Sequence, residues 1–428
     1  MEDSHIPFQP TVLSTHEYIR MKYDRLLTEK TLIPLQKENV FMTLNSYKIE
    51  IANSVLDDLR ERLTRTRLPE NDERGWEDGI DLTYLQELIT YWRDQFDWKA
   101  QEEKLNRFNQ LRGSVDGTTV HVIHEQGNGP APLPIVLAHG WPDSPFRFTK
   151  LIPLLTNPGA HGGDPADAFH VVAPSLPGYG FSLRDGSYGS SLFGFGSLLN
   201  AVMRELGYER YGAHGGDIGN GAIEMLVANH PQALIGVHLT DTLPFFRKPP
   251  SDLSQEEQAY LQGMEQFQYN EGAYVHLQGT KPWTPAAALM DSPAGLAAWI
   301  VEKFQAWSDC DGDIENRFSK DELLTNVMLY WVSGTIGSSF LAYRDFMKAR
   351  PMPAAQETEN QPVKDIRVPT GFAHFAKDFF STPPRSWAER FYDVQRWTEV
   401  PTGGHFAALE EPEILAEEIR AFFRPLRK

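Results

Sequence analysis

The chain has 428 residues, which is long for one ordinary domain but suits a large core with additions. Hydrophobic residues make up 41% of it and aromatic residues 12%, which is typical of a globular protein and excludes a largely disordered one. The formal net charge of −18 argues against nucleic acid or an acidic membrane surface as a partner.

The N-terminal part is predicted to become helical after an aperiodic start. Residues 1–43 are polar and lack periodicity, so we expect a lightly structured lead-in. A helix is predicted next, because leucines recur at helical spacing: Leu56, Leu59 and Leu63. Thr83 with Gln86 three residues later predicts a capping box for a second helix. Both helices offer amphipathic faces for packing and no chemistry.

Short strands and helices then alternate. Strands are expected at residues 118–126, 133–140 and 169–180, which are β-branched runs bounded by turn residues. Helices are expected at residues 192–206 and 219–230. This alternation predicts an α/β protein with a mainly parallel sheet covered on both faces.

The alternation stops near residue 245, where helical, aromatic-rich sequence replaces it, and a strand at residues 368–375 resumes the core. We therefore predict an α/β core that is interrupted by a helical cap. The expected regions are a lead-in at 1–43, an N-terminal extension with the first core strands at 44–130, a first core part at 131–245, the helical cap at 246–365 and a second core part at 366–428.

A carboxylate flanked by glycines is the first candidate for chemistry. The run Gly215-Gly216-Asp217-Ile218-Gly219 follows a short strand and precedes an apolar helix, which is the form of a nucleophile elbow with Asp in place of Ser. The helix N-terminus favours an anion at that point. A carboxylate there can attack a saturated carbon and form an alkyl ester. The alternative without chemistry is that Asp217 only caps the helix.

His405 is the candidate base. It lies in TGGHFAALEEPE near the C-terminus, and in hydrolases with this architecture the histidine comes last along the chain. It would deprotonate the water that hydrolyses the ester. With thirteen histidines in the chain, a loop histidine without chemistry is the alternative.

The segment AHGWPDS follows an apolar strand and predicts an oxyanion hole. The turn there lets the backbone N–H of Trp141 face the nucleophile, and the N–H of Ile218 would complete the pair of donors. We expect the substrate pocket to be lined by His139, Pro142 and Ile218.

Taken together, HGWPDS, GGDIG, KPW…MDSPAGLAAWIVEKF, VPTGFAHFAKDF and GGHFAALEEPE resemble the microsomal-type epoxide hydrolases, including soluble fungal members. The stretch VLDDLRERLTRTRLP…YLQELITYWRDQFDW is similar to the N-terminal extension of that family, which wraps the core. The resemblance covers about residues 45–428. It implies an α/β-hydrolase core with a helical cap insertion and an N-terminal wrapping segment, and an enzyme that converts an epoxide into a vicinal diol.

The resemblance implies three further residue roles. The charge-relay acid of the family lies in a segment like HFAKDFF, which maps onto Asp378 and would orient His405. From the residues alone Asp241 is a rival, because it also lies just past an apolar strand. Two cap tyrosines that hold the epoxide oxygen map onto Tyr274 and Tyr343, whose hydroxyl groups can donate to the developing alkoxide.

One residue departs from the family pattern. Trp usually follows the nucleophile, whereas this chain has Ile218, which keeps the N–H donor but makes the neighbouring wall smaller and aliphatic. Two alternatives remain at this point. One is a haloalkane dehalogenase-like hydrolase, which shares the Asp nucleophile. The other is a catalytically silent ligand-binding protein on the same fold.

No metal or organic cofactor is predicted, because every proton and charge in the mechanism has a partner in the protein. The run DCDGDIENRFSK from Asp309 has acids at three positions of a calcium loop, but Ile314 and Lys320 stand where Gly and Glu are needed. We interpret it as a solvated acidic loop between helices.

The expected partners are a small-molecule epoxide and water, and the resemblance adds a homodimer. A cytoplasmic location is predicted from three features: a single cysteine, Cys310; no run of 18 apolar residues; and an acidic start, MEDSHIPFQP, unlike a secretory signal.

Overall fold

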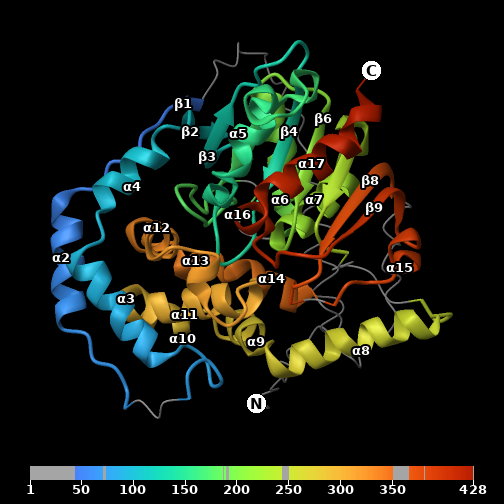
Figure 1. The fold of residues 1–428 in the computed structure, drawn as a ribbon. Helices are drawn as coiled ribbons and strands as arrows, with labels where there is room; N and C mark the ends of the chain where they lie inside the picture. The colour runs from blue at the N-terminus through green and yellow to red at the C-terminus, as the bar shows by residue number, and fades with distance from the viewer. Residues whose placement is uncertain are drawn as a thin grey trace, which may run out of the picture. The chain divides into compact units, whose positions relative to one another are not determined.

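The computed structural model describes residues 44–427 except 71–73, 187, 189–191, 243–249, 350–365 and 380, so the lead-in at 1–43 lies outside the described residues. The strands are β1 (Leu44–Ser46), β2 (Gln110–Val115), β3 (Thr118–Glu125), β4 (Leu133–Ala138), β5 (Phe169–Pro174), β6 (Tyr211–Gly215), β7 (Leu234–Leu239), β8 (Ile366–Phe375) and β9 (Tyr392–Val400) (Figure 1). The helices of the N-terminal part and the core are α2 (Asn53–Thr64), α3 (Leu82–Asp94), α4 (Trp98–Leu105), α5 (Leu151–Thr156), α6 (Leu192–Glu205), α7 (Ile218–Asn229), α15 (Arg385–Glu389), α16 (Ala407–Glu410) and α17 (Pro412–Phe423). The helices between β7 and β8 are α8 (Gln255–Asn270), α9 (Ala273–Thr280), α10 (Trp283–Asp291), α11 (Pro293–Trp307), α12 (Lys320–Ser333), α13 (Ile336–Ser339) and α14 (Leu341–Ala349).

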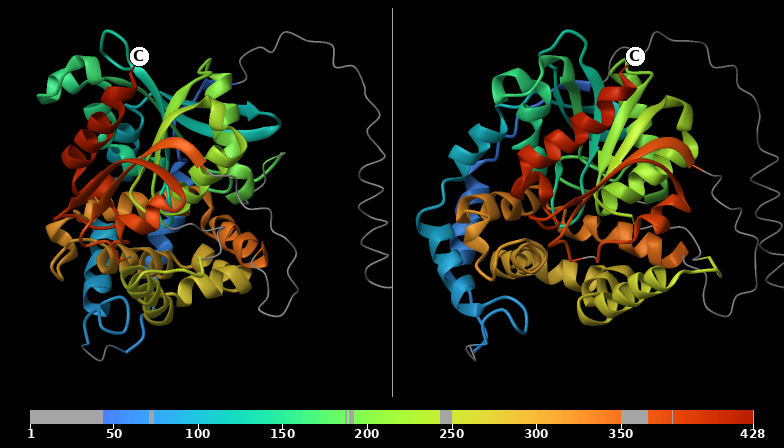
Figure 2. Two further views of the ribbon diagram at one scale, coloured as in Figure 1. Left: turned by 90° about the vertical axis from the view of Figure 1, so that its right-hand side faces the viewer. Right: turned by 45° about the vertical axis from the view of Figure 1, so that its right-hand side comes forward.

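The nine strands form one sheet in the order β1-β2-β3-β5-β4-β6-β7-β8-β9. The strands from β5 to β9 in that order run parallel, and β1, β2 and β3 pair antiparallel at the other edge. Helices α5 and α17 pack together, as do α6 and α7, and the two pairs cover opposite faces of the sheet (Figure 2). Strand β6 is buried at every position, as expected of a parallel strand covered on both sides. The predicted α/β class is confirmed.

Local sequence decides where α3 begins. The side chain of Asp81 accepts the N–H of Thr83 at 2.7 Å and caps the helix. The predicted capping box of Thr83 with Gln86 is therefore wrong, because a carboxylate two residues earlier supplies the acceptor. Two helices between β7 and β8 do begin with capping boxes, formed by Ser254 with Glu257 and by Ser319 with Glu322.

The helices α8 to α14 gather at one end of the sheet (Figures 1 and 2). Two hydrogen bonds tie α12 to the loop that follows β4. The hydroxyl of Tyr330 donates to the carbonyl of Asp143, and the amide of Asn326 donates to the carbonyl of Pro142, both at 2.8 Å. Since β4 is a parallel strand in the middle of the sheet, these contacts place the helical layer over the carboxyl ends of the strands.

The N-terminal helices lie against this helical layer, where α2 and α3 meet α11 and where α3 and α4 meet α12. Arg62 on α2 donates to Oδ1 of Asp291 at 2.8 Å. Tyr91 on α3 and Gln101 on α4 each donate to a carboxylate oxygen of Asp321 at 2.9 Å. The N-terminal segment thus joins the helices inserted after β7 by side-chain contacts. Among the described residues, no helix combines the length and the apolar character needed to cross a membrane.

Candidate active site

The turn between β6 and α7 carries Asp217 in a backbone conformation that few residues adopt, with φ of +54° and ψ of −131°. Two positions of this turn must be glycine because there is no room for a side chain. A Cβ on Gly216 would lie 2.2 Å from Oγ1 of Thr240, and one on Gly219 would lie 2.1 Å from the carbonyl oxygen of Ala138. The turn therefore holds the Asp217 carboxyl at the carboxyl ends of the strands.

Two backbone donors face this carboxyl group. The N–H of Trp141 donates to Oδ1 of Asp217 at 2.8 Å, and the N–H of Ile218 also donates to the carboxylate. Gly140 permits this approach, because a Cβ there would lie 2.6 Å from the same oxygen. Burial raises the pKa of Asp217, while the charge of His405 and these two donors oppose the rise. The structure thus brings together the residues predicted for an oxyanion hole.

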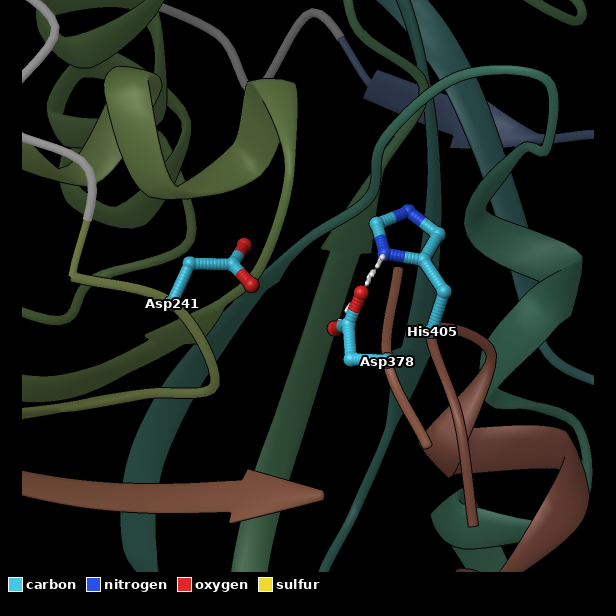
Figure 3. Close-up of side chains that lie close together, drawn as sticks. All are labelled: Asp241, Asp378 and His405. Carbon is cyan, nitrogen blue, oxygen red and sulfur yellow. Dashed lines mark hydrogen bonds and ion pairs between the residues drawn. The ribbon is translucent and has the colours of Figure 1, made fainter. Parts of the chain in front are cut away.

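His405 lies between two carboxyl groups. Its Nε2 atom is 3.7 Å from Oδ2 of Asp217, and its Nδ1 atom is 3.3 Å from Oδ1 of Asp378 (Figure 3). Burial disfavours the imidazolium, but the charge and hydrogen bond of Asp378, followed by the charge of Asp217, raise the pKa of His405 to about 9. A histidine placed in this way is oriented on one side and faces the nucleophile on the other.

Asp241, the rival for the relay acid, has a different hydrogen-bond partner. Its Oδ2 atom accepts the backbone N–H of Asp217, and its carbonyl oxygen accepts the side-chain amide of Asn220 at 3.0 Å. The imidazole Nδ1 of His405 bonds to Asp378 instead. Among the described residues, one group has the spacing of metal ligands, and it consists of Asp241, Asp378 and His405.

The two predicted cap tyrosines meet above Trp141. Tyr274 on α9 stacks on the Trp141 ring, with centroids 5.2 Å apart and an interplanar angle of 10°. Tyr343 on α14 meets Trp141 edge-on at 5.9 Å and Tyr274 at 5.9 Å. Burial raises the pKa of both phenols well above 10.0, and the charge of Asp217 adds to the rise. Both hydroxyl groups stay protonated and within electrostatic reach of the nucleophile.

The three residues expected to line a substrate pocket differ in how far their atoms are buried or already hydrogen-bonded. His139 is fully buried, and its Nε2 atom accepts the N–H of Leu176 at 3.0 Å, so that nitrogen is occupied by the backbone. The carbonyl of Pro142 is occupied by the cap. Ile218 keeps 6% of its surface exposed, directly beside the nucleophile.

Sequence reasoning missed a buried ion pair beneath the site. Nη1 of Arg147 lies 2.5 Å from Oδ2 of Asp143, and Nη2 donates to the carbonyl of His405 at 3.0 Å. The other oxygen of Asp143 accepts the N–H of Gly140 at 3.0 Å. The pair therefore connects the loop of the oxyanion hole to the loop of the base. The spacing of four residues in DSPFR was a signal, but nothing local pointed to His405.

The sequence indicated that the acidic run from Asp309 is a solvated loop. In the structure, the run also makes specific contacts. Oδ2 of Asp309 lies 2.8 Å from Nη2 of Arg317 and accepts the N–H of Gly403 at 2.9 Å. Arg317 also contacts Glu411 at 3.0 Å. The run is docked on the loop that carries His405, and two of its partners, Gly403 and Glu411, are too distant in sequence for the pattern to reveal.

Comparison with known proteins agrees with this geometry. A family model described as "Epoxide hydrolase N terminus" matches residues 44–148, and one described as "alpha/beta hydrolase fold" matches residues 134–282. A Stigmatella aurantiaca (strain DW4/3-1) protein named "Putative epoxide hydrolase" is 42% identical, with 90% of this chain and 86% of the relative covered. Epoxide hydrolase 1 of Sus scrofa is 34% identical over 89% of this chain and 88% of its own length.

Solved structures give the same result. The structure of the Aspergillus niger epoxide hydrolase superposes with a TM-score of 0.77 at 29% identity, covering 89% of this chain and 96% of that chain. This superposition and the family model for residues 134–282 show that the chain has the α/β-hydrolase fold. The chain belongs to the epoxide hydrolase family.

Proposed function

We propose that the chain converts an epoxide into a vicinal diol through a covalent hydroxyalkyl ester on Asp217. The observation that carries this proposal is the position of the Asp217 carboxylate, which accepts the N–H of Trp141 and faces Nε2 of His405. The relatives reported above are named as epoxide hydrolases, which favours this reaction over dehalogenation or silent ligand binding.

In the first step, a carboxylate oxygen of Asp217 attacks one epoxide carbon. The carbon–oxygen bond of the ring breaks, and its electron pair stays on the oxygen. Tyr274 and Tyr343 are proposed to hold that oxygen, because their protonated phenols meet above Trp141 and can donate as charge develops. One of the two phenols gives its proton to this oxygen, so the products of this step are an ester with a neighbouring hydroxyl group and a phenolate.

In the second step, His405 takes a proton from a water molecule, which attacks the ester carbonyl. Asp378 would stabilise the imidazolium through Nδ1. The N–H groups of Trp141 and Ile218 would hold the oxyanion of the tetrahedral intermediate. When this intermediate collapses, the ester oxygen leaves with the proton held by His405 as the second hydroxyl of the diol. The second proton of the water passes to the phenolate, and the Asp217 carboxylate is restored.

A single turnover in ¹⁸O-water with enzyme in excess over styrene oxide tests the proposal. The ester route leaves the label in the peptide that contains Asp217 and gives an unlabelled diol in the first turnover. Direct attack of water on the epoxide would give the opposite distribution and would overturn the proposal.

His405→Gln is the matched variant for the same experiment. It keeps the nucleophile but lacks the base, so the Asp217 peptide should gain the mass of the substrate. Asp217→Asn is the control, in which neither the added mass nor turnover is expected.

We also infer a cytoplasmic enzyme that forms a homodimer. The composition supports the location, and the family resemblance supports the dimer. Light scattering after size-exclusion chromatography tests the second point, and a mass of one chain at micromolar concentration would contradict it.

A further inference from the structure

Three carboxyl groups surround the imidazole of His405, and the mechanism above uses two of them. The third belongs to Asp241, which follows β7 and is 5% exposed. One carboxylate oxygen of Asp241, one of Asp378 and one ring nitrogen of His405 all lie within 4.8 Å of one another. Figure 3 shows the Asp241 carboxyl reaching toward the Asp378–His405 pair from a separate loop, without a bond to either.

Asp241 holds the nucleophile turn by two contacts. Its side chain accepts the N–H of Asp217, and its carbonyl accepts the Asn220 amide at 3.0 Å. One contact reaches the apex of the turn and the other the first turn of α7. Because Asp217 has a positive φ, a fixed acceptor for its N–H helps to keep this conformation.

The two acids beside His405 differ in their hydrogen-bond partners, because Asp378 bonds to the imidazole and Asp241 accepts the N–H of Asp217. Burial and the charge of Asp378 raise the pKa of Asp241 from its ordinary value of 3.8. Two buried carboxylates this close do not both ionise readily. Asp378 has the hydrogen bond to the imidazole, whereas the pKa of the Asp241 carboxyl is raised to about 7.

We propose that Asp241 is a positioning residue for Asp217 and also a reserve relay acid, which can orient His405 when position 378 carries no carboxyl group. This inference rests on the function proposed above. Without a charge at position 378, Asp241 loses the neighbour that opposes its ionisation. A side-chain rotation then has less than 4.8 Å to cover to reach the ring nitrogen.

A small cavity and several titratable groups lie beside Asp241. A cavity of about 10 Å³, room for roughly one water molecule, lies beside Asp241 and Asp378. The titratable groups that face Asp241, from the elements packed around it, are Asp217, Tyr260, His374, Asp378 and His405. His374 is neutral, since burial lowers its pKa to about 4, and Tyr260 is a protonated phenol because burial raises its pKa.

Asp241→Asn and Asp241→Ala separate the two roles. Asn keeps an oxygen for the N–H of Asp217 but cannot supply a charge, whereas Ala removes both. Stopped-flow measurement of ester formation should therefore show a larger loss for Asp241→Ala than for Asp241→Asn. Equal losses would contradict the positioning role.

The reserve role is tested against Asp378→Asn. Ester hydrolysis in that variant should fall by about 10²–10⁴-fold. Adding Asp241→Asn should cost at least a further tenfold or so, because no carboxylate then remains for Nδ1. A double variant as fast as Asp378→Asn would overturn the proposal.

A pH profile provides a second test that does not depend on the double variant folding. In Asp378→Asn, ester hydrolysis should gain an added dependence on a group that must lose a proton, and so should rise with pH where the parent is flat. An unchanged profile would also overturn the reserve role. If no variant forms an ester on Asp217, the proposed function itself fails, which is distinguishable from ester formation with unchanged hydrolysis.

Discussion

The Nε2 atom of His405 lies 3.7 Å from Oδ2 of Asp217, so the charge of the nucleophile acts directly on the base. That charge is one of the causes that raise the pKa of His405 to about 9. When Asp217 becomes an ester, its charge disappears and the pKa of His405 falls. The first step thereby prepares the imidazole to accept a proton in the second.

The contribution of His405 to stability should decrease as pH rises. Its pKa in the folded protein is about 9 and its ordinary value is 6.5, so the stabilisation is complete below pH 6.5 and is lost as pH rises through 9. The difference in melting temperature between the parent and His405→Gln should therefore shrink between pH 6 and pH 10. A difference that grows over this range would contradict the assigned charge state.

Removing either cap phenol should slow ester formation and spare ester hydrolysis. Tyr274→Phe and Tyr343→Phe each remove one donor to the epoxide oxygen, and a loss of about 10²-fold in the rate of ester formation is expected for each. Tyr269→Phe is the matched control, because Tyr269 is 87% exposed. Stopped-flow measurement separates the two steps, and an effect confined to ester hydrolysis would exclude the assigned role.

The buried pair of Arg147 and Asp143 should be essential to stability as a pair. Arg147→Ala leaves the Asp143 carboxyl buried without its partner, since the side chains are 7% and 1% exposed, and a loss of about 3–5 kcal/mol is expected. The double variant Asp143→Asn with Arg147→Met removes both charges and should recover part of that loss. Denaturant unfolding measures both values, and a double variant no more stable than Arg147→Ala would contradict the interpretation.

Ile218→Trp tests the departure from the family pattern. The backbone donor to Asp217 is unchanged, so trapping of the ester should persist. The larger ring beside the nucleophile should raise KM for branched epoxides and change enantiopreference, at a stability cost of about 1–3 kcal/mol from overpacking. Initial rates on a small and a branched epoxide measure this effect. Equal changes in KM for both substrates would show that the side chain at position 218 does not select substrate shape.

Much of the site could be predicted because its signals are local. The glycines around Asp217 and the Gly-Gly pair before His405 stand where a side chain would clash within a single turn. Such a requirement is visible in a short stretch of sequence. The assignment of Asp378 over Asp241 came from family resemblance, since both follow an apolar strand and only the packing of the strand ends shows which reaches the imidazole.

The contacts that could not be predicted join distant parts of the chain. Asp309 meets Gly403 across 94 positions, and Arg147 meets His405 across 258. No periodicity encodes such pairs. The start of α3 was misplaced for a simpler reason, because Asp81 is a better cap than Thr83 and precedes it.

The contacts between the N-terminal helices and the inserted helices have a consequence for biosynthesis. Tyr91 and Asp321 are 230 positions apart. At about 5–20 residues per second, a ribosome completes the acceptor roughly 10–45 s after the donor. During that interval the apolar faces of α2 and α3 await partners that have not yet been translated, so the yield of folded protein should depend on chaperone supply and on growth temperature.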